Sequence, residues 1–169
     1  MGNVAAHRFS APAPLTSDHR LDAFQCAEPE LEHWLKQRAL KNQLAGASRV
    51  FVVCADDAVV GYYALAAGSV RRTETPGRIR RNMPEPIPVA ILGRLAVHSA
   101  WGGRGIGGGL LKDAVERTLN LAEEMGIRIL LCHAISERAA KFYQDRGFVP
   151  SPVAPLTVML DLAPLARLR

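Results

Sequence analysis

A run of glycines between an apolar stretch and a helical pattern is the part of this sequence with the clearest chemical meaning. The run Gly102–Gly109 follows the apolar segment Val89–Val97 and precedes Leu110–Ala122, where apolar residues recur at helical spacing. A turn from a strand into a helix directs backbone N–H groups, and the positive end of the helix dipole, at one point. Five glycines among the seven residues 103–109 let the main chain approach a ligand closely. The turn is therefore predicted to bind a phosphate or pyrophosphate.

Two common phosphate-binding turns fit this run only in part. Gly103, Gly105 and Gly108 match the G-x-G-x-x-G dinucleotide fingerprint, but that motif also needs an acidic residue at the end of the next strand. The next predicted strand ends at Cys132-His133. A P-loop needs Lys and then Ser or Thr after its glycines, where this chain has Gly109 and Leu110. A tight turn that binds no ligand is the remaining alternative.

Two motifs of the sequence resemble those of the GNAT acetyltransferases. Gly-Gly-Arg-Gly-Ile-Gly at 102–107 is similar to the family's pyrophosphate turn, Arg/Gln-x-x-Gly-x-Gly/Ala, although Gly102 stands where the family carries Gln or Arg. Further on, the family's Ala-x-x-Phe-Tyr-x-x-x-Gly-Phe is matched by Ala139, Phe142, Tyr143, Gly147 and Phe148. The resemblance implies one α/β domain over residues 1–169. It implies the GNAT fold, a central mixed and twisted sheet of about six to seven strands flanked by about four helices.

The resemblance also implies roles for individual residues. Acetyl-CoA is the implied co-substrate, and the main chain of the strand ending at Val97 would pair with its pantetheine arm. Tyr143 is the implied general acid, because a phenol with an ordinary pKa near ~10 can protonate the leaving thiolate; an ordinary core or surface tyrosine is the alternative. The implied cofactor-binding residues are Leu95, Ala96, Val97, Gly103, Arg104, Gly105, Ile106, Gly107, Gly108, Ala134, Ser136, Ala139 and Phe142.

A general base is harder to identify. His98 and His133 are the candidates, although a histidine at the end of a strand is usually structural. A base is unnecessary if the acceptor is an α-amino group, which titrates near ~7.7–8.0 and lower beside an ester. A lysine side chain, with a pKa near ~10.4, would need help. The lack of an obvious carboxylate base therefore favours an α-amino acceptor on an ester.

Positive charge is concentrated in one segment. The chain has 21 Lys and Arg against 16 Asp and Glu, a net charge of +5. The segment Arg71–Arg81 holds five arginines and one glutamate, so it contributes +4. Such a patch favours a polyanion, and nucleic acid is the commonest one. The alternative is a solvated basic loop.

The basic segment and the strand after it resemble the GNAT toxins of bacterial toxin–antitoxin pairs. The resemblance rests on Gly77–Pro88, Leu92–Val97 and Phe142–Pro152. It implies acetylation of the α-amino group of aminoacyl-tRNA, which blocks translation. It also implies a ribbon-helix-helix antitoxin, contact with operator DNA only through the antitoxin complex, and a homodimer. The expected tRNA-binding residues are Arg71, Arg72, Arg78, Arg80, Arg81, Arg94 and Lys36.

Two other functions remain open at this stage. One is an acetyltransferase for a small amine or a protein N-terminus; an enzyme for a cationic small molecule would usually carry acidic residues, which the basic segment does not supply. The other is a non-catalytic nucleic-acid-binding or co-repressor protein on the same fold, which would be expected to lose Tyr143 or the glycine run. The sequence does not indicate which aminoacyl-tRNA is preferred.

Size and composition limit the remaining possibilities. The 169 residues, 49% of them hydrophobic, suit one globular domain. No apolar run is long enough to span a bilayer and no apolar signal core begins the chain, so a cytoplasmic protein is expected. Cys54 and Cys132 lie in apolar runs and are expected to be buried thiols. No spacing of potential ligands suggests a metal.

The elements that must position these residues follow from periodicity and turn residues. The prolines at 76, 84, 86 and 88 are expected to exclude regular structure from the basic segment. Ser136 is expected to cap the helix after it. The predicted strands are Val4–Phe9, Val50–Cys54, Val59–Val70, Val89–Val97, Ile127–His133 and Leu156–Leu160. The predicted helices are His19–Phe24, Pro29–Gly46, Leu110–Gly126 and Glu137–Arg146.

Overall fold

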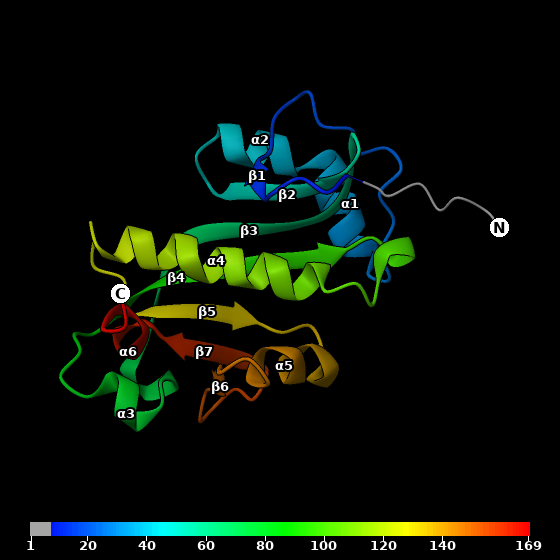
Figure 1. The fold of residues 1–169 in the computed structure, drawn as a ribbon. Helices are drawn as coiled ribbons and strands as arrows, with labels where there is room; N and C mark the ends of the chain where they lie inside the picture. Colours follow the sequence, from blue (N-terminus) through cyan, green and yellow to red (C-terminus); the bar gives the residue numbers. More distant parts are fainter. Residues whose placement is uncertain (1–7) are drawn as a thin grey trace. The chain divides into compact units, whose positions relative to one another are not determined.

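The computed structural model describes residues 8–169, which form both helices and strands (Figure 1). The strands are β1 (Ala13–Pro14), β2 (Arg49–Ala55), β3 (Ala58–Val70), β4 (Ile87–Val97), β5 (Ile129–His133), β6 (Val149–Pro150) and β7 (Thr157–Asp161). The α-helices are α1 (Pro29–Gln37), α2 (Ala39–Leu44), α3 (Gly77–Arg80), α4 (Ile106–Ala122), α5 (Glu137–Gln144) and α6 (Leu162–Ala166). Two single-turn 3₁₀-helices are η1 (Arg72–Glu74) and η2 (Ser99–Trp101).

The strands form a seven-stranded mixed sheet in the order β1-β2-β3-β4-β5-β7-β6. The pair β4–β5 is parallel, whereas β1–β2, β5–β7 and β6–β7 are antiparallel. This agrees with the mixed α/β sheet that was predicted. Two compact units share the chain: unit 1 runs up to Ala64 and includes Arg94–Asp113, and unit 2 comprises Leu65–Gly93 and Ala114–Arg169.

Unit 1 has a core of apolar side chains from β2, β3 and the two amino-terminal helices. Figure 1 shows α1 and α2 close together beside β2. One helix over Pro29–Gly46 was predicted, but the helix breaks at Arg38, where φ is −126°. Trp34 on α1 and Ala39 on α2 are both buried in the same core, so the two helices face it together.

The predicted helix at His19–Phe24 is wrong. The backbone of Arg20 instead pairs with Ala58 in an isolated parallel bridge, which requires extended chain. A turn at Thr16 comes just before it, since the Thr16 N–H donates to His19 Nδ1 at 2.9 Å. Of the strand predicted at Val4–Phe9, residues 4–7 lie outside the described residues, and Phe9 forms an isolated bridge with Ala55.

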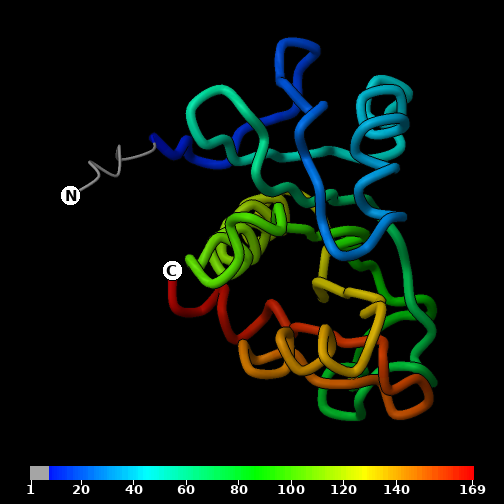
Figure 2. The backbone as a smooth tube through the Cα atoms, turned by 90° about the vertical axis from the view of Figure 1, so that its right-hand side faces the viewer, coloured from blue at the N-terminus to red at the C-terminus, as the bar shows by residue number. Residues whose placement is uncertain are grey.

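Unit 2 has its own core, which includes side chains from β5, β7 and the segment before β4. Helix α5 lies beside β7 in both Figure 1 and Figure 2. The basic segment was predicted to lack regular structure, and this is wrong. Pro76 precedes the single-turn helix α3, because its fixed φ suits a helix start, and Ile79 of that turn is buried in the core. The prediction also failed at Pro88, which lies inside β4.

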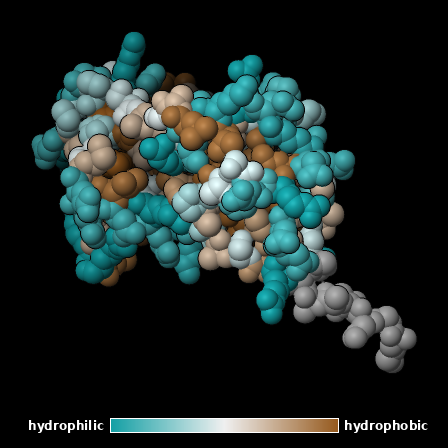
Figure 3. All heavy atoms as spheres, turned by 90° about the horizontal axis from the view of Figure 1, so that it is seen from above, coloured by the Kyte–Doolittle hydropathy of each residue, from teal (hydrophilic) through white to brown (hydrophobic). Residues whose placement is uncertain are grey.

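Two of the three cysteines are buried, and the face drawn in Figure 3 is mostly hydrophilic. Cys54 and Cys132 are buried free thiols, as predicted, and Cys26 is half-buried. Among residues 8–169 there is no helix with the length and apolar character needed to cross a membrane. Hydrophilic residues cover most of the face in Figure 3, with smaller apolar areas between them.

Candidate active site

The glycine turn joins β4 to α4 in unit 1. Helix α4 begins at Ile106, earlier than the predicted start at Leu110, so Gly107–Gly109 belong to its first turn. Gly103 and Gly105 adopt positive φ angles of 73° and 80°, a region that residues with a Cβ avoid. These two glycines therefore let the chain reverse directly into the helix.

The start of α4 presents a set of backbone donors. The Gly109 N–H donates to the Gly105 carbonyl at 3.0 Å, the first such bond of the helix. The N–H groups of Ile106, Gly107 and Gly108 precede that bond and have no acceptor within the helix. Together with the helix dipole, they form an arrangement suited to an anion.

The helix start also packs closely on β3. A Cβ built on Gly61 would lie 3.0 Å from Leu110 Cδ1 and 3.1 Å from Ile106 Cγ2. A side chain at position 61 would therefore require Leu110 and Ile106 to shift slightly. A cavity of about 250 Å³ flanks this first turn, and its lining consists of Phe9, Pro12, Val53, Arg104, Gly105, Ile106, Gly109 and Leu110.

Trp101, just before the glycine turn, makes two contacts with its aromatic ring. The Arg104 guanidinium lies 4.6 Å from the centre of the Trp101 ring. The Phe9 ring meets Trp101 edge-on, with the ring centres 5.3 Å apart. Of the predicted cofactor-binding residues, Leu95, Ala96 and Val97 form the end of β4 that leads into this turn, and Ala96 is buried.

Tyr143 lies in unit 2, on α5, and its side chain is only 6% exposed. Its ring contacts those of Phe142 and Phe148, with ring centres 5.2 Å and 5.4 Å away. Its hydroxyl is hydrogen-bonded to the thiol of Cys132 on β5. Burial raises the pKa of Tyr143 far above its usual range, and the neighbouring Cys132 raises it further. The phenol therefore stays protonated, as a general acid must be before it acts.

The predicted cap of α5 is confirmed. Ser136 Oγ accepts a hydrogen bond from the Ala139 N–H at 3.1 Å. Ser136 is exposed, Ala134 is buried, and Ala139 and Phe142 are half-buried. The Arg146 guanidinium covers one face of Phe142, 3.9 Å from the ring centre. The predicted cofactor-binding residues that belong to unit 2 thus lie on α5 or on the connection that leads into it.

The two histidine candidates for a general base differ in how their ring nitrogens are engaged. His98 Nδ1 accepts from the Ala100 N–H at 3.0 Å, and His98 Nε2 lies 2.9 Å from the Ala23 carbonyl oxygen. Both nitrogens are therefore occupied. His133 is exposed, and its Nδ1 lies 3.0 Å from Thr157 Oγ1.

The basic segment belongs to unit 2 and is packed within it. Ile79 is buried, and Thr75 Oγ1 donates to the Arg71 carbonyl at 2.9 Å. Ser151 Oγ donates to the Glu74 carbonyl at 2.5 Å, which fixes the segment to the chain near β6. Five side chains of this segment are exposed and make no ion pair within residues 8–169, namely Arg71, Arg72, Arg78, Arg80 and Arg81.

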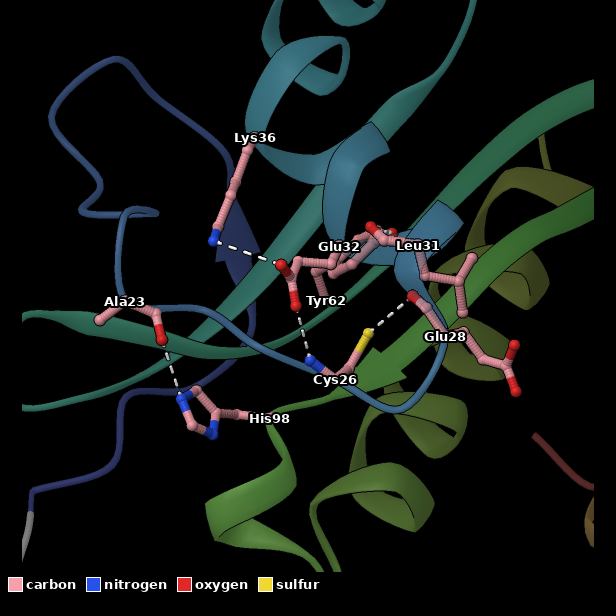
Figure 4. Close-up of polar contacts among 8 residues, drawn as sticks. All are labelled: Ala23, Cys26, Glu28, Leu31, Glu32, Lys36, Tyr62 and His98. Atoms are coloured by element: carbon pink, nitrogen blue, oxygen red, sulfur yellow. Dashed lines mark hydrogen bonds and ion pairs between the residues drawn. The ribbon is translucent and has the colours of Figure 1, made fainter.

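The other two predicted tRNA-binding residues lie in unit 1 and have partners of their own. The Arg94 guanidinium stacks on Trp34, 4.2 Å from the ring centre. Lys36 forms an ion pair with Glu32 at 3.6 Å, one turn away on α1 (Figure 4). Both side chains are half-buried, unlike those of the basic segment.

Sequence reasoning missed the contact between Cys132 and Tyr143. It treated Cys132 as an ordinary buried thiol, and burial is correct. The two residues are eleven positions apart and lie on different elements, so no local spacing could indicate that they meet. Burial raises the pKa of Cys132 to about 11, which keeps the thiol neutral.

Comparison with known proteins gives a consistent result. The model of the family described as "Acetyltransferase (GNAT) domain" matches residues 46–150. A tRNA-acetylating toxin of Mycobacterium tuberculosis is 46% identical over 152 residues, which cover 90% of this chain and 92% of the relative.

Two solved structures also match most of the chain. The structure of AtaT complexed with acetyl-methionyl-tRNAfMet matches with a TM-score of 0.88 and 25% identity, covering 95% of this chain and 99% of that one. A structure of AtaTR bound with AcCoA matches with a TM-score of 0.81 and 25% identity, covering 95% of this chain and 97% of that one.

Proposed function

Since the chain belongs to the GNAT acetyltransferase family, we propose that it is the toxin of a toxin–antitoxin pair. It transfers the acetyl group of acetyl-CoA to the α-amino group of aminoacyl-tRNA, and so blocks translation. The observation that carries this proposal is the 46% identity to a tRNA-acetylating toxin over 90% of the chain. The exposed arginines of the basic segment support a substrate that carries many phosphates.

The glycine turn binds the pyrophosphate of acetyl-CoA in this proposal. The N–H groups of Ile106, Gly107 and Gly108 supply the donors, and the positive φ angles at Gly103 and Gly105 direct them. This fits the residues present, because such binding needs main-chain groups and tolerates Gly102 in place of Arg or Gln. The remaining predicted cofactor residues supply main-chain pairing along β4 and contacts at α5, namely Leu95, Ala96, Val97, Arg104, Ala134, Ser136, Ala139 and Phe142.

Tyr143 provides the proton for the leaving group. Acetyl-CoA, when bound, supplies a thioester carbonyl that the amine attacks; the new C–N bond forms as the C–S bond breaks. The leaving sulfur takes the phenolic proton of Tyr143, and the amine nitrogen loses a proton to solvent. Burial raises the Tyr143 pKa, so the hydroxyl carries its proton before the step.

The amine needs no base from the protein. An α-amino group beside an ester is largely free amine near pH 7. His98, whose two ring nitrogens are both engaged, is not required as a base. The proposal therefore assigns proton removal to water.

The tRNA binds through the exposed arginines of the basic segment, with Arg94 and Lys36 as further contacts. Each phosphate contact releases a counterion, so binding should weaken steeply with salt. We further infer a ribbon-helix-helix antitoxin as partner, contact with operator DNA only through the antitoxin complex, a homodimer, and action in the cytoplasm. These inferences rest on the resemblance to toxins and on the name of the relative from M. tuberculosis.

The test is direct acetylation of charged tRNA. Labelled acetyl-CoA is incubated with the protein and total aminoacyl-tRNA, and label is sought in N-acetyl-aminoacyl-tRNA. Uncharged tRNA, and aminoacyl-tRNA whose amine is already formylated, serve as controls and should take no label. Label on a small amine or a protein N-terminus, with none on charged tRNA, would contradict the proposal.

The tRNA surface is tested by charge removal. Replacing Arg78 and Arg81 with Gln should weaken tRNA binding about tenfold and reduce the slope of log K against log[salt] by about 1.4. A matched double variant, Arg20→Gln with Arg167→Gln, removes the same charge from exposed positions outside the basic segment. Equal weakening by both pairs would mean that the basic segment makes no particular phosphate contacts.

A further inference from the structure

Five hydrogen bonds meet at the point where β4 ends and the glycine turn begins. The His98 N–H donates to the Val60 carbonyl at 2.8 Å, and its carbonyl accepts from the Trp101 N–H at 2.9 Å. The two ring nitrogens bind Ala100 and Ala23, as described above. The Ser99 N–H donates to the Gln25 carbonyl at 2.8 Å. Figure 4 shows the imidazole pointing from the end of β4 to the Ala23 carbonyl on the segment before α1.

The hydrogen bonds fix the protonation of the imidazole. Nδ1 accepts from the Ala100 N–H, so it carries the lone pair, and it caps the single turn η2. Nε2 faces a carbonyl oxygen, so it carries the hydrogen. A neutral imidazole thus joins two backbone segments, one through each nitrogen.

Packing holds the ring in that position. The His98 ring meets Phe24 edge-on, with ring centres 5.8 Å apart, and Phe24 is 1% exposed. Phe24 in turn contacts Tyr62 at 5.8 Å, and the Tyr62 hydroxyl donates to the Leu31 carbonyl at 2.6 Å (Figure 4). The imidazole is therefore anchored in the unit 1 core rather than free to rotate.

The glycine turn needs such an anchor. Glycine loses more conformational freedom on ordering than any other residue, and Gly102, Gly103 and Gly105 follow within seven positions of His98. A binding site that must order itself loses affinity, whereas one held in place before binding does not. Bonds from Ala23 and Gln25 fix the start of the turn, and α4 fixes its end.

We propose that His98 is a positioning residue for the cofactor turn. It ties the segment Ala23–Gln25 to the start of the turn and keeps the backbone donors near Ile106 in their binding arrangement. This inference rests on the proposed function, because it assumes that the turn binds CoA. His98 acts through the turn and touches neither substrate nor cofactor, so it should govern the affinity for CoA and leave the chemical step alone.

The experiment compares His98→Ala, His98→Asn and wild type. Binding of CoA is measured by isothermal titration, and KM for acetyl-CoA and kcat are measured with charged tRNA. His98→Ala should raise the Kd and KM about tenfold with kcat within about twofold, since both ring contacts are lost. In His98→Asn, the amide oxygen replaces Nδ1 as the cap but cannot replace the bond to Ala23, so an increase of about threefold is expected.

Val50→Ala is the stability control. Val50 is fully buried in the same core, on β2 rather than on the turn. It should lower the melting temperature at least as much as His98→Ala and leave the Kd for CoA unchanged. Equal weakening of CoA binding by Val50→Ala would overturn the inference, because His98 would then act only through general stability.

The outcomes separate this inference from the proposed function. If His98→Ala binds CoA within twofold of wild type, or if Asn rescues nothing, the positioning role is wrong. If wild type binds CoA but does not acetylate aminoacyl-tRNA, the proposed function fails while the titration still decides the role of His98. Failure of wild type to bind CoA would overturn both.

Discussion

The glycine turn and the surroundings of Tyr143 differ in the chemical groups that they offer. In the turn, Gly103–Gly105 are exposed, and the groups available to a ligand belong to the main chain. Tyr143 is 6% exposed; its ring contacts two other aromatic rings, and its hydroxyl is hydrogen-bonded to a thiol. Under the proposed function, binding of the cofactor's phosphates would depend on backbone conformation, whereas proton transfer would depend on one side chain.

This contrast explains the departure at Gly102. A long polar side chain there would add a contact, but the donors of Ile106–Gly108 come from the main chain and do not depend on it. No such substitution is expected to be tolerated at Tyr143, since no other residue supplies a phenol there. The two regions should therefore respond to mutation in different kinetic parameters.

The largest effect is expected from Tyr143→Phe. The ring still packs against Phe142 and Phe148, but the proton donor is gone, so kcat should fall about 100- to 10,000-fold. CoA affinity, measured by titration, should change by less than about twofold. A wild-type rate of aminoacyl-tRNA acetylation in this variant would mean that Tyr143 is not the general acid.

A smaller effect, on KM for acetyl-CoA rather than on kcat, is expected from Gly105→Ala. Its φ of 80° costs a residue with a Cβ about 1–2 kcal/mol, so KM for acetyl-CoA should rise about tenfold while kcat stays within twofold. No atom lies within 4 Å of the new Cβ, so the cause would be conformational rather than a clash.

Gly102→Gln is the matched control for that variant. Gly102 has an extended conformation, with φ −63° and ψ 155°, that any residue adopts. Its KM for acetyl-CoA should equal that of wild type or fall by a few-fold, as a contact is added. If Gly102→Gln impaired binding as much as Gly105→Ala, backbone conformation would not be the property that matters in the turn.

The smallest effect is expected from Cys132→Val. This variant tests, through protein stability, whether burial keeps the thiol beside Tyr143 neutral. The Cys132 pKa is about 11 when folded and 9.0 as its ordinary value, so the folded state holds the proton more tightly. Below pH 9 the thiol is protonated in both states, so the free energy of unfolding keeps its full value. As the pH rises from 9 to 11, the unfolded state loses its proton first, and the free energy of unfolding falls by about 2 kcal/mol. Wild type should therefore lose more stability than Cys132→Val between pH 9 and 11 in urea unfolding.

Cys54→Val serves as the control for the thiol. Burial raises the pKa of Cys54 as well, but less strongly, and Ser10 opposes that shift through a hydrogen bond. Cys54→Val should therefore change the loss of stability between pH 9 and 11 less than Cys132→Val does. Equal slopes in wild type and Cys132→Val would show that the thiol near Tyr143 is not held neutral by burial.

The sequence predicted the parts that local patterns determine. The central strand, the glycine turn, the cap at Ser136 and the last strand all appear near their expected positions, because each depends on periodicity or on one capping side chain. The mixed character of the sheet follows from the order of these elements and agrees with the family resemblance, but the short edge strands β1 and β6 were not among the predicted strands.

The errors arose where distant contacts override local preference. Arg20 is drawn into a bridge with Ala58, so the helix expected at His19–Phe24 does not form. Ile79 is buried in the unit 2 core, and this burial stabilises a helical turn among prolines. The anchoring of His98 by Ala23 joins residues 75 positions apart, so no sequence spacing could indicate it.

The close approach at Gly61 has an evolutionary consequence. A Cβ there would lie 3.1 Å from Ile106 Cγ2 and 3.0 Å from Leu110 Cδ1, so these two side chains would have to shift by a few tenths of an ångström. Relatives with alanine at this position should carry a smaller side chain at position 106 or 110, and the pair should covary in an alignment. Selection on the glycine turn would thereby extend to a residue of β3, a strand that is not part of the turn.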